Sequence, residues 1–81
     1  MSNASQVRAF SNAFRSARQG AGYTLQDLTD EVAETDPEAS LETFTAWEGG
    51  KAGPREWERP TVEAVERALG VEGTLVDALG W

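Results

Sequence analysis

The chain of 81 residues contains neither cysteine nor histidine. It therefore has no thiolate or imidazole ligand for a zinc site, no disulfide, and no Ser-His or Cys-His pair for nucleophilic catalysis. For chemistry only carboxylates, lysine, tyrosine and hydroxyl groups remain. We expect a protein that is not an enzyme and that needs no metal ion or cofactor.

Long apolar runs are also missing. No stretch approaches the length of a membrane-spanning helix, and the first six residues lack the charged start and apolar centre of a signal peptide. The absence of cysteine is compatible with a reducing compartment. We therefore expect a cytoplasmic protein that does not contact a membrane. The length suffices for one domain with a modest core and not for two.

Positive charge is scarce. Seven Lys and Arg residues face fourteen Asp and Glu residues, which gives a formal net charge of -7. Between Arg18 and Lys51 there is no basic residue and there are eight acidic ones: Asp27, Asp30, Glu31, Glu34, Asp36, Glu38, Glu42 and Glu48. This balance opposes non-specific attraction to nucleic acids and to anionic lipids.

Apolar residues recur at spacings of three and four along most of the chain, which predicts amphipathic helices. The expected helices span about 5–19, 24–34, 40–48, 61–69 and 74–79, with residues 1–4 disordered. Thr24 and Thr61 are the expected caps of the second and fourth helices. Because no alternation typical of β-strands is present, the predicted fold class is all-α.

The stretch 40–50 is the centre of this organisation. Ser40 caps a short helix, Phe44 and Trp47 share its inward face, and Gly49-Gly50 ends it. The connector before this helix is polar and acidic. The segment after it, 49–60, contains Gly and Pro residues typical of an irregular loop, and we expect Trp57 in that loop to cover the core.

Four short motifs follow one another in this chain. Tyr23-Thr24-Leu25-Gln26-Asp27-Leu28 begins the second predicted helix, Trp47-Glu48 and Gly50-Lys51 end the third, and Ala68-Leu69-Gly70-Val71 ends the fourth. In this order they resemble the Cro/C1-type (XRE-type) helix-turn-helix family of bacterial and phage DNA-binding transcription regulators, over about Phe10 to Leu79. The resemblance implies a lambda-repressor-like domain whose second helix crosses the DNA backbone and whose third helix enters the major groove.

The resemblance also implies roles for individual residues in binding double-stranded DNA. The candidates for base contacts are Ser40, Leu41, Glu42, Thr43 and Ala46. The candidates for backbone contacts are Thr24, Thr45, Lys51, Arg55 and Arg59. Arg18 and Glu48 are expected to form a structural ion pair between the first and third helices. Each exposed charge also has a simpler interpretation as a solubilising surface residue.

Three features depart from the family pattern, of which one is an extended loop after the third helix. Leu25 occupies a position where family members commonly place a glutamine, and its side chain cannot form a hydrogen bond. The turn between the second and third helices is about five residues longer than usual, through 34–38, and it is acidic. Positive charge for DNA must then come from Arg15, from the candidates after the third helix, or from residues outside this chain.

A second function remains open at this point. A helix-turn-helix fold with an acidic face also suits a protein-protein interaction module with a basic partner. The last helix leaves alternatives open as well. Leu75, Val76, Leu79 and Trp81 either form a homodimer interface or complete the core of the monomer.

Overall fold

The computed structural model describes residues 2–81, with side chains from residue 5 onward. Its elements are α1 (Ser2–Gly20), α2 (Leu25–Ala33), α3 (Leu41–Gly49), the 3-10 helix η1 (Glu56–Glu58), α4 (Arg59–Leu69) and α5 (Thr74–Leu79). Residues 2–81 contain no strand, so the predicted all-α fold class is confirmed.

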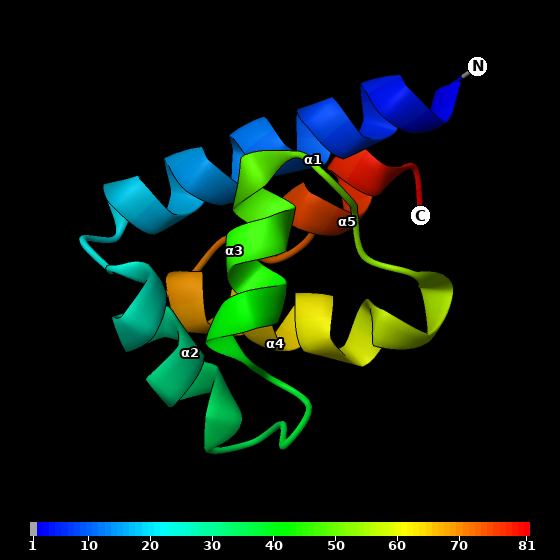
Figure 1. Cartoon of the computed structure of the whole chain (residues 1–81). Coiled ribbons are helices and arrows are strands. Elements are labelled where there is room, and N and C mark those ends of the chain that lie inside the picture. Colours follow the sequence, from blue (N-terminus) through cyan, green and yellow to red (C-terminus); the bar gives the residue numbers. More distant parts are fainter. Residues whose placement is uncertain (1) are drawn as a thin grey trace.

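The helices form one bundle in which α1 lies across α3 and α5 (Figure 1). α2 packs against α3 and α4, and α4 packs against α5 and η1. The start of α1 and the end of the chain lie on the same side of the molecule (Figure 1), where Gln6 and Val7 border a hollow with Leu79 and Trp81.

The core is centred on aromatic side chains from α1 and α3. The Trp47 ring meets Phe10 edge-on, with 5.5 Å between ring centroids, and lies 5.2 Å from Phe44. Such edge-on and tilted pairs add to the stabilisation that burial itself provides. The other elements contribute mainly aliphatic residues, and the buried apolar set is Phe10, Phe14, Leu28, Val32, Phe44, Trp47, Val62, Ala64, Val65, Leu69, Leu75 and Leu79.

Side-chain caps explain why α2 and α3 begin close to the predicted residues. The amide of Asp27 donates to the Thr24 hydroxyl at 3.0 Å, and the Thr24 amide donates to the Asp27 carboxylate at 3.3 Å, which forms a reciprocal capping box. At the start of α3 the Ser40 hydroxyl accepts from the Thr43 amide at 3.1 Å. Gly50 adopts φ +75°, so α3 ends where the glycine pair predicted.

α5 is capped from another helix. Its N-cap residue is Gly73, which has no side chain to accept a hydrogen bond. The carboxylate of Glu66 on α4 serves as the acceptor instead. Glu66 is only 3% exposed, and its Oε2 accepts from the amides of Leu75 and Val76 at 2.8 and 3.0 Å. The buried charge therefore satisfies two backbone donors at the start of α5.

Two predicted helix starts are wrong. α1 begins at Ser2, so residues 2–4 are helical where disorder was expected; Met1 lies outside the described residues. α4 begins at Arg59 because η1 leads directly into it and Pro60 fits the first turn of a helix. Thr61 is therefore not a cap; it is buried, and its hydroxyl donates to the carboxylate of Asp36 in the α2–α3 connector.

The expectation that Trp57 covers the core is also wrong. Its side chain is 73% exposed on η1, with the Arg55 guanidinium 5.3 Å from the ring centroid. Pro54 is the buried residue of this loop, and Gly53 lies so near α1 that an added Cβ would be 3.3 Å from Val7. The loop packs on the bundle through these small residues, which leaves the tryptophan outside.

The apolar residues of the last helix complete the core. Leu75 and Leu79 are buried, and Val76 and Trp81 are partly buried against the same cluster. Of the two interpretations of these residues, the structure supports packing within the monomer.

Candidate nucleic-acid interface

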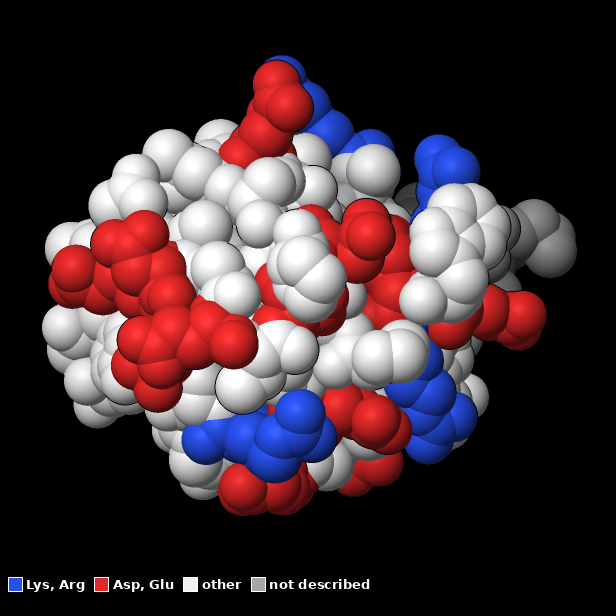
Figure 2. Space-filling view, turned by 90° about the horizontal axis from the view of Figure 1, so that it is seen from below, with Lys and Arg blue, Asp and Glu red and all other residues white. Residues whose placement is uncertain are grey.

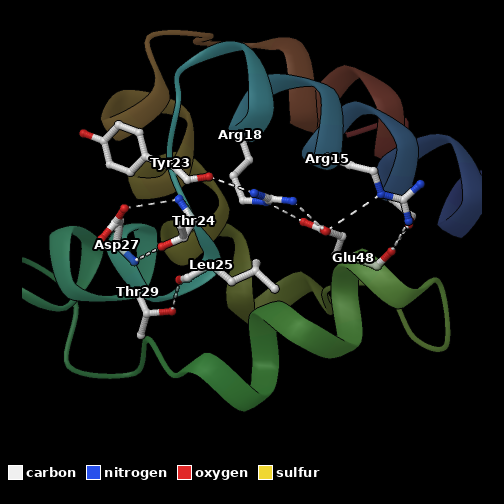
Figure 3. Close-up of polar contacts among 9 residues, drawn as sticks. Arg15, Arg18, Tyr23, Thr24, Leu25, Asp27, Thr29 and Glu48 are labelled. Atoms are coloured by element: carbon white, nitrogen blue, oxygen red, sulfur yellow. Dashed lines mark hydrogen bonds and ion pairs between the residues drawn. The ribbon is translucent and has the colours of Figure 1, made fainter.

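The end of α3 is fixed to α1 through Glu48. Arg18 Nε donates to Glu48 Oε1 at 2.7 Å, and Arg18 Nη2 donates to Oε2 at 2.8 Å (Figure 3). Arg18 Nη1 also donates to the carbonyl of Tyr23 at 2.7 Å. The ion pair that the resemblance implied is therefore present, and the same guanidinium holds the turn before α2.

The geometry of this pair affects how Arg18 titrates. The hydrogen bonds that Arg18 donates to Glu48 raise the pKa of the guanidinium above its ordinary value, partial burial acts in the opposite direction, and attraction between the charges raises the pKa further. Arg18 therefore stays charged at every pH at which proteins are normally studied. The stability that it contributes is present below the ordinary pKa of arginine and is lost only at higher pH.

The backbone of Glu48 is held as well. Its carbonyl accepts from the Ser11 hydroxyl at 2.7 Å and from Arg15 Nη2 at 3.0 Å. With the Arg18 pair, three side chains of α1 bind this one residue of α3. A helix positioned in this way presents its remaining surface in a defined orientation.

The outward face of α3 is uncovered and largely uncharged. Leu41 is 41% exposed, Glu42 and Thr45 are exposed, and Ala46 is half-buried. With Gly49 and Lys51 these residues line a shallow hollow along the helix. The structure thus brings together five of the sequence-predicted contact residues, Leu41, Glu42, Thr45 and Ala46 along the helix and Lys51 at its end.

Ser40 and Thr43 are less available. The Ser40 hydroxyl donates to the Thr43 hydroxyl at 2.9 Å and accepts from the Thr43 amide, and both residues are half-buried. Their polar groups cap α3. Thr24 has a similar structural role at the start of α2, although it is exposed.

Arg55 and Arg59 lie apart from this hollow. Arg55 is beside Trp57, and Arg59 donates through Nε to Glu63 at 3.1 Å one turn further along α4. Three cations were predicted to contact the DNA backbone. Within the part of the chain whose side chains are described, Lys51 is the one of these three that lines the α3 hollow.

Sequence reasoning named Arg15 as a source of positive charge but missed Arg8, a second cation on the same face of α1. Arg8 and Arg15 line another hollow together with Val7, Ser11 and Asn12 of the same helix and with Gly49, Gly50 and Lys51. The signal was present in the spacing, because residues 8, 12 and 15 lie on one face of a helix. Arg8 was not noticed because it lies before the matched motifs.

Acidic residues gather on the side of α3 where α2 packs. Exposed Asp27, Asp30, Glu31 and Glu34 occupy α2 and its end. Figure 2, which views the molecule from below, shows a broad acidic area on the side where α2 lies. The few cations thus lie beside the end of α3, and the many acidic residues lie on the side of α2.

Among the described residues no group of His, Cys, Asp and Glu side chains is arranged to hold a metal ion. None of the helices in residues 2–81 combines the length and the apolar character needed to cross a bilayer. Comparisons of the chain with protein-family models, with curated proteins and with solved structures find no match.

Proposed function

We propose that this chain is a sequence-specific DNA-binding module of a bacterial or phage transcription regulator. In this proposal α2, the long connector and α3 form a helix-turn-helix of the Cro/C1 type, and α3 enters the major groove. The observation that carries the proposal is the outward face of α3, which is uncovered, held in place by Glu48 at its end, and bordered by a cation at Lys51.

The chemistry of this face fits the edges of base pairs. The Glu42 carboxylate can accept a hydrogen bond from the amino group of cytosine, and the apolar surfaces of Leu41 and Ala46 suit a thymine methyl group. The Thr45 hydroxyl, which is exposed at the edge of the face, can donate to a phosphate. The module therefore gains more of its specificity from apolar contact than from hydrogen bonds.

The acidic α2 surface limits the affinity. Phosphates repel Asp30, Glu31 and Glu34, so favourable backbone contacts must come from the other side of α3, where Lys51 and the α1 arginines lie. We expect binding that is modest and decreases as salt concentration rises.

Selection from a randomised DNA duplex library, followed by fluorescence anisotropy, tests this function. The wild-type protein should enrich a defined sequence and bind it in the presence of competitor DNA. Glu42→Ala should change the base preferred at one position, whereas Glu72→Ala, which removes an exposed carboxylate between α4 and α5, should select the same sequence. Absence of enrichment by the wild-type protein at low salt would refute the proposal.

A specific observation favours the second candidate function, binding of a basic protein. The exposed face of α2 carries Asp27, Asp30 and Glu31, and no cation lies in this helix. Such a surface suits a partner rich in lysine and arginine. Failure to bind any duplex, together with saturable binding of a basic polypeptide that is lost when Asp30 and Glu31 are changed to Asn and Gln, would support this alternative.

A further inference from the structure

The end of α3 meets α1 at a hollow that the proposed base contacts do not use. Arg8, Ser11, Asn12 and Arg15 follow one another at spacings that place them on one face of α1. The other wall is formed where α3 ends, at Gly49–Lys51. Residues from two elements distant in sequence thus enclose the same space.

This hollow is positively charged in an acidic protein. Three of the seven basic residues, Arg8, Arg15 and Lys51, line it, and no carboxylate is among its lining residues within the described chain. The ion pairs among described side chains involve neither Arg8 nor Lys51. Arg15 lies 3.8 Å from a Glu48 carboxylate that Arg18 already binds with two hydrogen bonds, so two arginines share one negative charge.

The shape of the hollow leaves room for a small anion. Gly49 and Gly50 contribute no side chains, and a Cβ at Gly49 would meet nothing within 4 Å. Asn12, exposed in the middle of the wall, adds a neutral amide donor. Two guanidinium groups, an ammonium group and an amide are the donors that proteins use to bind phosphate oxygens.

We propose that the hollow formed by Arg8, Asn12 and Arg15 of α1 with Gly49–Lys51 binds a phosphate group. It shares Gly49 and Lys51 with the hollow along the outward face of α3. A phosphate bound there lies directly beside the residues proposed to contact bases. The site thus accepts one backbone phosphodiester of the DNA, and this part of the inference rests on the proposed function.

Titration with inorganic phosphate at constant ionic strength, followed by amide resonances in NMR spectra, tests the site without DNA. Saturable shifts should centre on Asn12 and Gly49–Lys51. Arg8→Gln should weaken phosphate binding at least about 5-fold, since it removes one of three cations. Arg67→Gln is the matched control, because Arg67 is also an exposed helical arginine but lies on α4.

The result that overturns the site is an absence of saturable shifts, or equal weakening by Arg8→Gln and Arg67→Gln. A second variant tests the shape independently of charge. Gly49→Leu adds a side chain at a residue that lines the hollow, where an added Cβ has no atom within 4 Å, without removing a cation, and it should also weaken phosphate binding. Unchanged affinity in this variant would count against the hollow as the place of binding.

The salt dependence of duplex DNA binding provides a second test. Arg8→Gln should reduce the slope of log K against log salt concentration by about 0.9, the value for one lost phosphate contact. If phosphate binds as described but no duplex does, the site stands and the proposed function fails. If a duplex binds and the slope is the same in Arg8→Gln as in wild type, the proposed function stands and the inference that the hollow accepts a DNA phosphodiester is refuted.

Discussion

The two ends of α3 are held to the rest of the molecule by different interactions. At the C-terminal end, Trp47 is packed among the α1 phenylalanines and Glu48 is bound by Arg18 and Ser11. At the N-terminal end, the Ser40 hydroxyl caps the helix and the preceding connector is tied to α4 by Asp36. The first end is fixed by aromatic packing and a bidentate ion pair, and the second by hydrogen bonds of the Ser40 and Thr61 hydroxyl groups.

Charge differs between the same two ends. Cations of α1 and Lys51 surround the C-terminal end, whereas Glu34, Glu38 and the acids of α2 lie on the N-terminal side. The comparison shows that a net charge of -7 does not describe the surface around α3. A polyanion approaching this helix is attracted at one end and repelled at the other, which gives it a preferred orientation.

Removal of the aromatic anchor at the C-terminal end should have the largest effect. Trp47→Ala should lower the free energy of unfolding by about 3–5 kcal/mol, because Trp47 is only 3% exposed and its loss leaves a cavity. Urea denaturation followed by circular dichroism measures the change. Trp57→Ala, which removes an exposed indole, should cost under about 1 kcal/mol; an equal loss in both variants would contradict the assignment of Trp47 as the anchor.

Removing the negative charge of Glu48 should have the next largest effect. Glu48→Gln leaves Arg18, whose side chain is 14% exposed, without its counter-ion, and we expect a loss of about 2–3 kcal/mol. The same denaturation measurement applies. Glu63→Gln breaks the exposed pair with Arg59 and should cost about 0–1 kcal/mol. A loss in Glu48→Gln no greater than in this control would show that the pair does not fix α3 on α1.

At the N-terminal end a cap can be removed without a cavity. Ser40→Ala should destabilise the protein by about 1 kcal/mol, since the Thr43 amide loses its acceptor. Ser16→Ala, at an exposed position inside α1, provides the control and should be neutral or slightly stabilising. Amide hydrogen exchange should increase in the first turn of α3 only; a uniform increase along α3 would mean that both ends depend on the cap.

The smallest expected effect concerns charge at the N-terminal end. Glu38→Gln removes one repulsive charge from the connector and should strengthen duplex binding about twofold at low salt, with the difference lost as salt rises. Fluorescence anisotropy at two salt concentrations measures this. Glu72→Gln, in the segment between α4 and α5, should leave affinity nearly unchanged. An identical gain in both variants would show that total charge matters and position does not.

The sequence predicted the parts of this structure that depend on local chemistry. The Thr24 capping box, the Ser40 cap and the glycine end of α3 are interactions within four residues, and all three are present. The apolar spacing of the third helix likewise identified Phe44 and Trp47 as core residues, and both are buried. The Arg18–Glu48 pair came from the family resemblance, because no local rule joins residues thirty positions apart.

The errors arose where tertiary packing decides the outcome. A tryptophan in a small protein is usually buried, but the short loop around Trp57 reaches α1 through Gly53 and Pro54. Arg8 gains significance only because α3 ends against its face of α1, which periodicity alone does not reveal. Within the candidate interface, the sequence therefore identified the face of α3 and the cations Arg15 and Lys51, but not Arg8 beside them.

The capping of α5 by Glu66 has a consequence for the order of folding. A six-residue helix is too short to be stable alone, and the acceptor for its first amides is supplied by α4, nine residues earlier in the chain. α5 can therefore become ordered only once α4 has formed and the Glu66 carboxylate is in place. The C-terminal segment therefore forms its helix as the bundle assembles and does not nucleate the bundle. A peptide of residues 70–81 should be a random coil in water.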